Sequence, residues 1–146
     1  MAQQPTGTPP GSRKPNDQII SYYTLRILIG ATGILLPILV VIGKWISNGT
    51  PALEFSISDY YDNGAGGDIL VGVLFVLGFF LLSYKGPEKI DNRTADVGCV
   101  AALGVALFPT TYCAGCWVYY LHFVFALTLF SVFIFFSLVL FRKTDP

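Results

Sequence analysis

Charged residues are scarce in this chain. Aspartate, glutamate, lysine and arginine make up 12% of the 146 residues, about half the share found in a typical soluble domain. Basic and acidic residues number nine each, so the net charge is zero, and the basic footprint of a nucleic-acid-binding protein is absent. Hydrophobic residues make up 53%, and the mean hydropathy is +0.62. This composition indicates an integral membrane protein.

Histidine and cysteine are also scarce. His122 is the single histidine, and the three cysteines are Cys99, Cys113 and Cys116. One histidine argues against a zinc site built from several histidines, as in the alkaline ceramidase type of membrane hydrolase. A hydrolase-like set of Ser56, Asp68 and His122 is therefore a weak alternative.

Four apolar runs dominate what is present. A helix rises about 1.5 Å per residue, so about 20 apolar residues cross the roughly 30 Å of bilayer hydrocarbon. The clearest run ends at Arg142 and Lys143 and contains no formal charge. The predicted spans are residues 24–43, 68–84, 95–111 and 117–141. The sequence thus predicts an all-α integral membrane protein, a four-helix transmembrane bundle.

Small residues and a proline suggest how these helices pack. Gly30 and Gly33 in the first span leave room for a close neighbour, and Pro37 predicts a kink. The third span is rich in glycine and alanine, which is typical of a helix buried among others.

The distribution of lysine and arginine predicts the orientation. Eight of the nine basic residues fall in the N-terminal region, in the turn after the second span, or at the C-terminus; Lys44 is the exception. The positive-inside rule then places both termini in the cytoplasm (N-in/C-in). The connection 47–67 becomes an extracytoplasmic acidic loop. Residues 1–18 form a predicted disordered cytoplasmic tail without the apolar middle of a signal peptide, and residues 19–146 form a single transmembrane domain.

A Cys-x-x-Cys pair precedes the last span. Cys113 and Cys116 face outward in this topology, where such a pair can cycle between dithiol and disulfide. The arrangement resembles quinone-linked thiol oxidoreductases of the disulfide-bond and vitamin K epoxide reductase type, and quinone would be a cofactor only in that case. Those enzymes use a second cysteine pair, whereas Cys99 has no mate. A static disulfide, two ordinary thiols, or a zinc site shared with His122 are the alternatives.

Polar residues of the outer loop and His122 form a predicted ligand-binding set. An ionisable residue inside a span is a functional candidate, and His122 lies one turn into the last span. The set comprises Ser56, Ser58, Tyr60, Tyr61, Asp68 and His122. The acidic residues around Gly64 loosely match a calcium loop but fail its spacing. We expect no metal.

The chain resembles a family of small, functionally uncharacterised bacterial polytopic membrane proteins. The matching positions are Leu25, Arg26, Gly30, Gly33, Leu36, Pro37, Ser56–Ser58, Tyr60, Tyr61, Asp68, Val71, Gly72, Leu74, Gly78, Phe80, Leu81, Tyr84–Gly86, Asp91, Gly98, Ala106–Thr110 and His122. The resemblance implies a bacterial membrane protein and supplies no activity. Longer members continue past the fourth helix, so it also implies a short form, and the Cys-x-x-Cys is not a family feature.

These observations together predict a multi-pass protein of the bacterial inner membrane. Its expected role is non-enzymatic: it binds a membrane lipid, a small ligand, a membrane-protein partner or a second copy of itself. No binding of nucleic acid is expected. The alternative is a thiol-disulfide oxidoreductase using Cys113 and Cys116.

Overall fold

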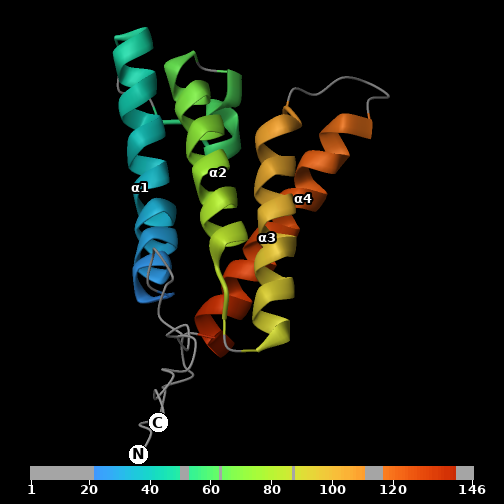
Figure 1. The fold of residues 1–146 in the computed structure, drawn as a ribbon. Coiled ribbons are helices and arrows are strands. Elements are labelled where there is room, and N and C mark those ends of the chain that lie inside the picture. The colour runs from blue at the N-terminus through green and yellow to red at the C-terminus, as the bar shows by residue number, and fades with distance from the viewer. Residues whose placement is uncertain (1–21, 50–52, 63, 87, 111–116, 141–146) are drawn as a thin grey trace, which may run out of the picture.

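The structure is a computed structural model that describes residues 22–49, 53–62, 64–86, 88–110 and 117–140 (Figure 1). Throughout these ranges the regular secondary structure is helical, so the predicted all-α class is confirmed there. The elements are α1 (Tyr22–Asn48), the short 3-10 helix η1 (Ile57–Asp62), α2 (Ala65–Ser83), α3 (Lys89–Leu107), α4 (Trp117–Phe135) and the π-helical turn η2 (Phe136–Leu140). The predicted tail 1–18 and the pair Cys113 and Cys116 lie outside the described residues.

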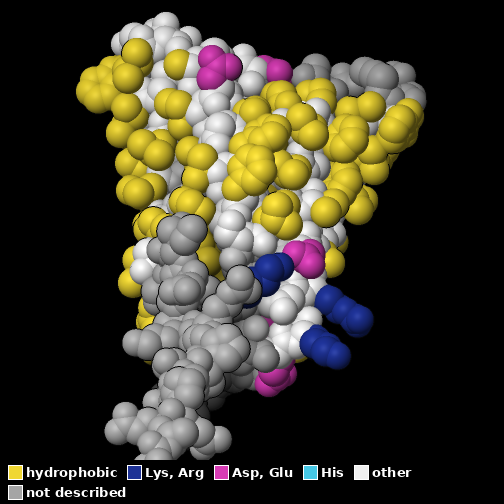
Figure 2. Space-filling view, in the orientation of Figure 1, with side chains coloured by type: hydrophobic (Ala, Val, Ile, Leu, Met, Phe, Trp, Pro, Cys, Tyr) yellow, Lys and Arg dark blue, Asp and Glu magenta, His cyan; other side chains and the backbone are white. Residues whose placement is uncertain are grey.

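Within the described part of the chain, three helical segments are long and apolar enough to cross a membrane. They are Tyr23–Asn48, Ala65–Ser83 and Trp117–Val139. Large apolar side chains point away from the protein on these segments; Ile34 and Leu127, for example, are each 71% exposed. Figure 2 shows hydrophobic side chains over the upper part of one face, with lysine and arginine gathered near the lower end of α3. Such a surface is costly in water and favourable in lipid, so the protein is membrane-embedded.

The start of α3 differs from the predicted third span. The helix begins at Lys89, more than a turn before residue 95. The backbone N–H of Glu88 donates to Asp91 Oδ2 at 3.2 Å, which satisfies a donor at the helix start. Lys89 to Arg93 lie between the predicted second and third spans, so the turn there is shorter than predicted, because these residues belong to α3.

The predicted burial of the glycine- and alanine-rich α3 is confirmed. Each helix packs against the next one in the chain: α1 on α2, α2 on α3, and α3 on α4. Ala95 and Ala102 are fully buried. At Gly104 the backbone of α3 lies so close to Phe125 of α4 that a Cβ would be 2.3 Å from its ring. Small residues thus allow α3 and α4 to pack closely, as is common between membrane helices.

Gly30 and Gly33 of α1 differ from the prediction. A Cβ added at Gly30 or Gly33 would meet no heavy atom within 4 Å, so among the described residues neither glycine supports a close helix contact. Both instead border open space between α1 and α4, as the cavities described below show. Close α1–α2 contacts occur instead at Gly43, where a Cβ would lie 3.0 Å from the carbonyl oxygen of Ala65, and at Gly66, where a Cβ would lie 3.2 Å from that of Val40.

Candidate functional site

The C-terminal end of α3 sets up the site. The last carbonyl groups of a helix have no partner within the helix and need donors from elsewhere. The carbonyl of Ala106 accepts a hydrogen bond from the Tyr61 hydroxyl at 2.9 Å. The carbonyl of Phe108, just after the helix, lies 2.7 Å from Nδ1 of His122. Pro109 follows, and its ring favours ending the helix at this point. Tyr61 and His122 therefore satisfy backbone acceptors that the chain leaves open here.

His122 is completely buried in α4 and uses both ring nitrogens. A carbonyl oxygen can only accept, so Nδ1 carries the proton that is donated to Phe108. In the neutral imidazole this tautomer leaves Nε2 as an acceptor. Nε2 lies 3.2 Å from the hydroxyl oxygen of Ser58, so the Ser58 hydroxyl donates to His122. The carbonyl partner sets the direction of the Nδ1 bond, and the direction of the Nε2 bond is that of the neutral imidazole.

Two further contacts hold this cluster together. The hydroxyl of Thr110 donates to the carbonyl oxygen of Ser58 at 3.2 Å. The Tyr61 ring meets the His122 ring edge-on, with centroids 6.5 Å apart and planes at 89°. Burial raises the pKa of Tyr61 above its usual range, and the Asp62 carboxylate raises it further. The phenol therefore stays protonated at neutral pH and continues to donate to Ala106.

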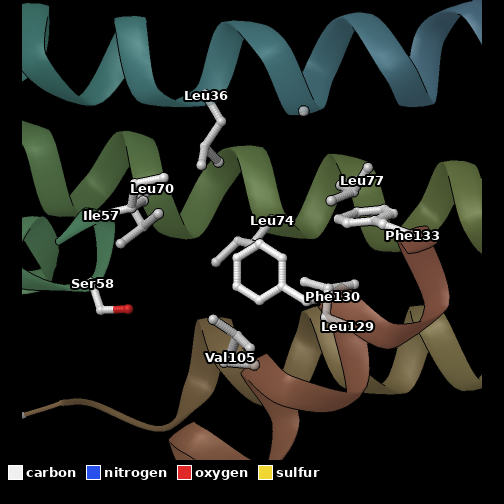
Figure 3. Close-up of a pocket in the computed structure, with 12 residues that line it drawn as sticks. Leu36, Ile57, Ser58, Leu70, Leu74, Leu77, Val105, Leu129, Phe130 and Phe133 are labelled. Carbon is white, nitrogen blue, oxygen red and sulfur yellow. The ribbon is translucent and has the colours of Figure 1, made fainter. Parts of the chain in front are cut away.

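An apolar cavity of about 280 Å³ adjoins this cluster. Its walls come from α1, η1, α2, α3 and α4: Gly33, Leu36, Ile57, Ser58, Leu70, Leu74, Leu77, Val105, Ala126, Leu129, Phe130 and Phe133. Of these described residues, Ser58 alone has a polar side chain. Figure 3 shows the Ser58 hydroxyl pointing toward the space among Leu70, Leu74 and Phe130. The cavity is therefore an apolar space with one polar side chain in its wall.

A second apolar cavity of about 200 Å³ lies between α1 and α4. Its walls include Ile29, Gly30 and Phe136, and it shares Gly33 and Phe133 with the first cavity. We call the two together the α1–α4 groove. The groove follows α1 and α4 from near Ser58 toward the opposite end of the molecule.

The structure brings together three of the six predicted ligand-binding residues: Ser58, Tyr61 and His122. Ser56 and Asp68 are exposed; the backbone N–H of Ser56 donates to Asp59 Oδ2 at 3.0 Å. The weak hydrolase-like set of Ser56, Asp68 and His122 is therefore not assembled, because the serine on His122 is Ser58.

Tyr60 of η1 does not join the contacts of Ser58, Tyr61 and His122 described above and has a structural role. It is 3% exposed, and its hydroxyl accepts a hydrogen bond from the backbone N–H of Glu54 at 3.1 Å. Its ring lies 5.6 Å from Nζ of Lys44, which forms an ion pair with Glu54. Through Tyr60 and Glu54 the connection 47–67, which the sequence predicts as an acidic loop, packs against the end of α1.

Sequence reasoning missed the backbone carbonyl of Phe108, the hydroxyl of Thr110 and the groove. A backbone acceptor has no side-chain signature, although Pro109 marks the helix end that exposes it. Thr110 reads as a polar residue ending a span. The apolar residues of the groove look like ordinary lipid-facing positions, because the sequence does not show which helices lie apart.

Metal and thiol chemistry find no support in the described residues. They contain no group of three or more histidine, cysteine or acidic side chains that could hold a metal. Both nitrogens of His122 are hydrogen-bonded, and Cys99 is buried. The redox pair Cys113 and Cys116, and a zinc site that includes it, lie outside the described residues and stay predictions.

Comparison of the chain with protein-family models, with curated proteins and with solved structures finds no match. The resemblance to a bacterial membrane family therefore stays a prediction.

Proposed function

We propose that this protein binds a membrane lipid, with an acyl chain in the α1–α4 groove and the polar end of the lipid next to Ser58. The observation that carries this proposal is the cavity of about 280 Å³, whose described lining is apolar except for Ser58. Ligand sites of this kind combine an apolar wall with a few placed polar groups, and they begin at roughly 300 Å³. A lipid, which has an apolar acyl chain and a polar end, matches this arrangement of apolar and polar lining residues.

The location of the groove supports a ligand from the bilayer. The groove lies between α1 and α4, two of the three helices that are apolar enough to span a membrane. Its residues Ile34 and Phe130 are 71% and 59% exposed, so in a membrane they face lipid. A lipid can enter from the side without passing through water.

The proposal includes four membrane crossings, N-in/C-in, in a bacterial inner membrane. Arg26 at the start of α1 and the basic residues at the α2–α3 turn share one end of the molecule (Figure 1). At the other end Lys44 is paired with Glu54. This charge asymmetry supports an orientation by the positive-inside rule, in which Ser58 lies on the outer side. The close packing of α3 against α2 and α4 supports its being the fourth crossing helix.

Filling the groove tests lipid binding. We expect Gly33→Phe to reduce cross-linking of a phosphatidylethanolamine with a photoreactive acyl chain by about tenfold or more. Gly33 borders both cavities and has open space at its Cβ position, so a phenyl ring fits there and displaces the ligand. Loss of two buried methylenes costs about 1.6 kcal/mol, or slightly more than tenfold in affinity. The measurement is the cross-linked fraction in liposomes of phosphatidylethanolamine and phosphatidylglycerol, mapped by peptide mass spectrometry.

The matched control is Gly72→Phe in α2. Gly72 also has no heavy atom within 4 Å of its Cβ position, but it borders neither cavity of the groove. This variant should retain wild-type cross-linking at groove residues. Equal cross-linking of Gly33→Phe and Gly72→Phe would contradict lipid binding in the groove.

A further inference from the structure

The serine that faces the groove has the hydrogen-bond arrangement of an activated nucleophile. Ser58 Oγ lies 3.2 Å from Nε2 of His122, and Nδ1 of His122 lies 2.7 Å from the carbonyl oxygen of Phe108. A nucleophile, a base within reach, and a third group that orients the base form the arrangement used in covalent catalysis. In the neutral imidazole the Phe108 carbonyl selects the tautomer in which Nε2 is free of a proton, as general-base action requires.

We infer that Ser58 is the nucleophile and His122 the general base of an ester-cleaving site for a lipid whose acyl chain lies in the groove. This inference rests on the proposed lipid binding and adds a reaction to it. The substrate class is a neutral or zwitterionic lipid ester: the described lining of the cavity includes no basic side chain to bind an anionic head, and the nearby Lys44 is paired with Glu54.

The position of Ser58 suits an ester carbonyl. Ester groups of membrane lipids lie where the hydrocarbon region meets the polar headgroups. Ser58 borders the apolar cavity on one side, while its neighbours Ser56 and Asp59 in the same segment are exposed. An acyl chain in the groove therefore places its ester near Ser58, and water reaches the same point from the exposed side of η1.

The reaction balances with water as the one co-substrate. Ser58 Oγ bonds to the ester carbonyl carbon while its proton passes to Nε2 of His122. The bond from that carbon to the alcohol oxygen then breaks, and the alcohol takes the proton from Nε2. Water next adds to the acyl carbon and gives a proton to Nε2; the bond to Ser58 Oγ breaks, and Oγ regains the proton. One ester and one water give one carboxylic acid and one alcohol, with no change in oxidation state.

The test is covalent labelling of the full chain in liposomes by two alkyl fluorophosphonates, one with a short and one with a long alkyl chain. We expect both probes to modify Ser58, as identified by peptide mass spectrometry, and Ser58→Ala to abolish that adduct. His122→Asn should slow labelling by about 100-fold or more, because general-base catalysis contributes that much. The asparagine amide can still donate to the Phe108 carbonyl, so this variant removes the base and retains the contact that organises the fold.

The control and the contrary outcomes separate reactivity from binding. Ser56→Ala removes an exposed serine two positions away and should label like the wild type. A wild-type protein without a Ser58 adduct, or with equal labelling in His122→Asn, overturns the inference. If Gly33→Phe leaves both lipid cross-linking and long-chain labelling unchanged while the short probe still modifies Ser58, the lipid groove fails and the nucleophile stands. If Gly33→Phe blocks lipid cross-linking but Ser58 never reacts, lipid binding stands and the nucleophile fails.

Discussion

Replacing His122 with leucine is expected to lower the free energy of unfolding by about 3 kcal/mol. The substitution removes the donor to the Phe108 carbonyl and the acceptor of the Ser58 hydroxyl. Each buried polar group left without a partner costs about 1–3 kcal/mol. Leucine is close to histidine in size, so the change creates little cavity. The measurement is reversible unfolding in mixed micelles of dodecyl maltoside and SDS, followed by circular dichroism.

Two variants make this expectation specific. His122→Asn retains a donor to the Phe108 carbonyl and should lose roughly half as much stability. Leu127→Ala removes a side chain of α4 that is 71% exposed and should change stability by less than about 0.5 kcal/mol. A His122→Leu protein as stable as the wild type would show that the two hydrogen bonds contribute nothing to the fold in a membrane environment.

The sequence predicts the helices well where hydrophobic length decides, and less well where local capping decides. The apolar runs that form α1, α2 and α4 contain few charged residues, so the length of each run alone identifies it as a helix. The start of α3 is different, because Lys89, Asp91 and Arg93 suggest a polar turn. The hydrogen bond from the Glu88 backbone to Asp91 caps the helix there. This capping pattern involves only two residues, and the neighbouring basic residues make the segment look like a turn.

The site shows a similar division. His122 is identifiable because it is the single histidine and lies within an apolar run. Choosing between Ser56 and Ser58 requires the path of the chain through η1, which places Ser58 against His122 and leaves Ser56 exposed. The role of Gly33 also depends on tertiary structure: the same glycine would pack closely if α1 touched α4, and it borders a groove because the helices lie apart.

The cluster and the helix packing are connected through one phenylalanine. The Phe125 ring stacks on the Phe108 ring with centroids 5.5 Å apart and planes at 5°, and Phe108 supplies the carbonyl that His122 binds. Phe125 also lies against the backbone of α3 at Gly104. The close approach of α3 and α4 therefore positions the acceptor that sets the tautomer of His122.

Gly104→Leu is accordingly expected to lower the free energy of unfolding by about 3 kcal/mol and to slow any labelling of Ser58. A Cβ at this position would lie 2.3 Å from the ring of Phe125, so Phe125 or the helix itself must move. Overpacking of this kind costs about 1–3 kcal/mol, and a leucine side chain adds bulk beyond the Cβ. Displaced Phe125 no longer supports Phe108, which moves the carbonyl away from His122.

Gly72→Leu is the matched control, because the same substitution on α2 meets no heavy atom within 4 Å at the Cβ position. Removing a helical glycine without a clash should leave stability unchanged or slightly higher. Unfolding in mixed micelles and the rate of fluorophosphonate labelling are measured on both variants. A Gly104→Leu protein that matches Gly72→Leu in both measurements would mean that α3 and α4 do not approach closely at Gly104, and the support of the Phe108 carbonyl by this packing would then be wrong.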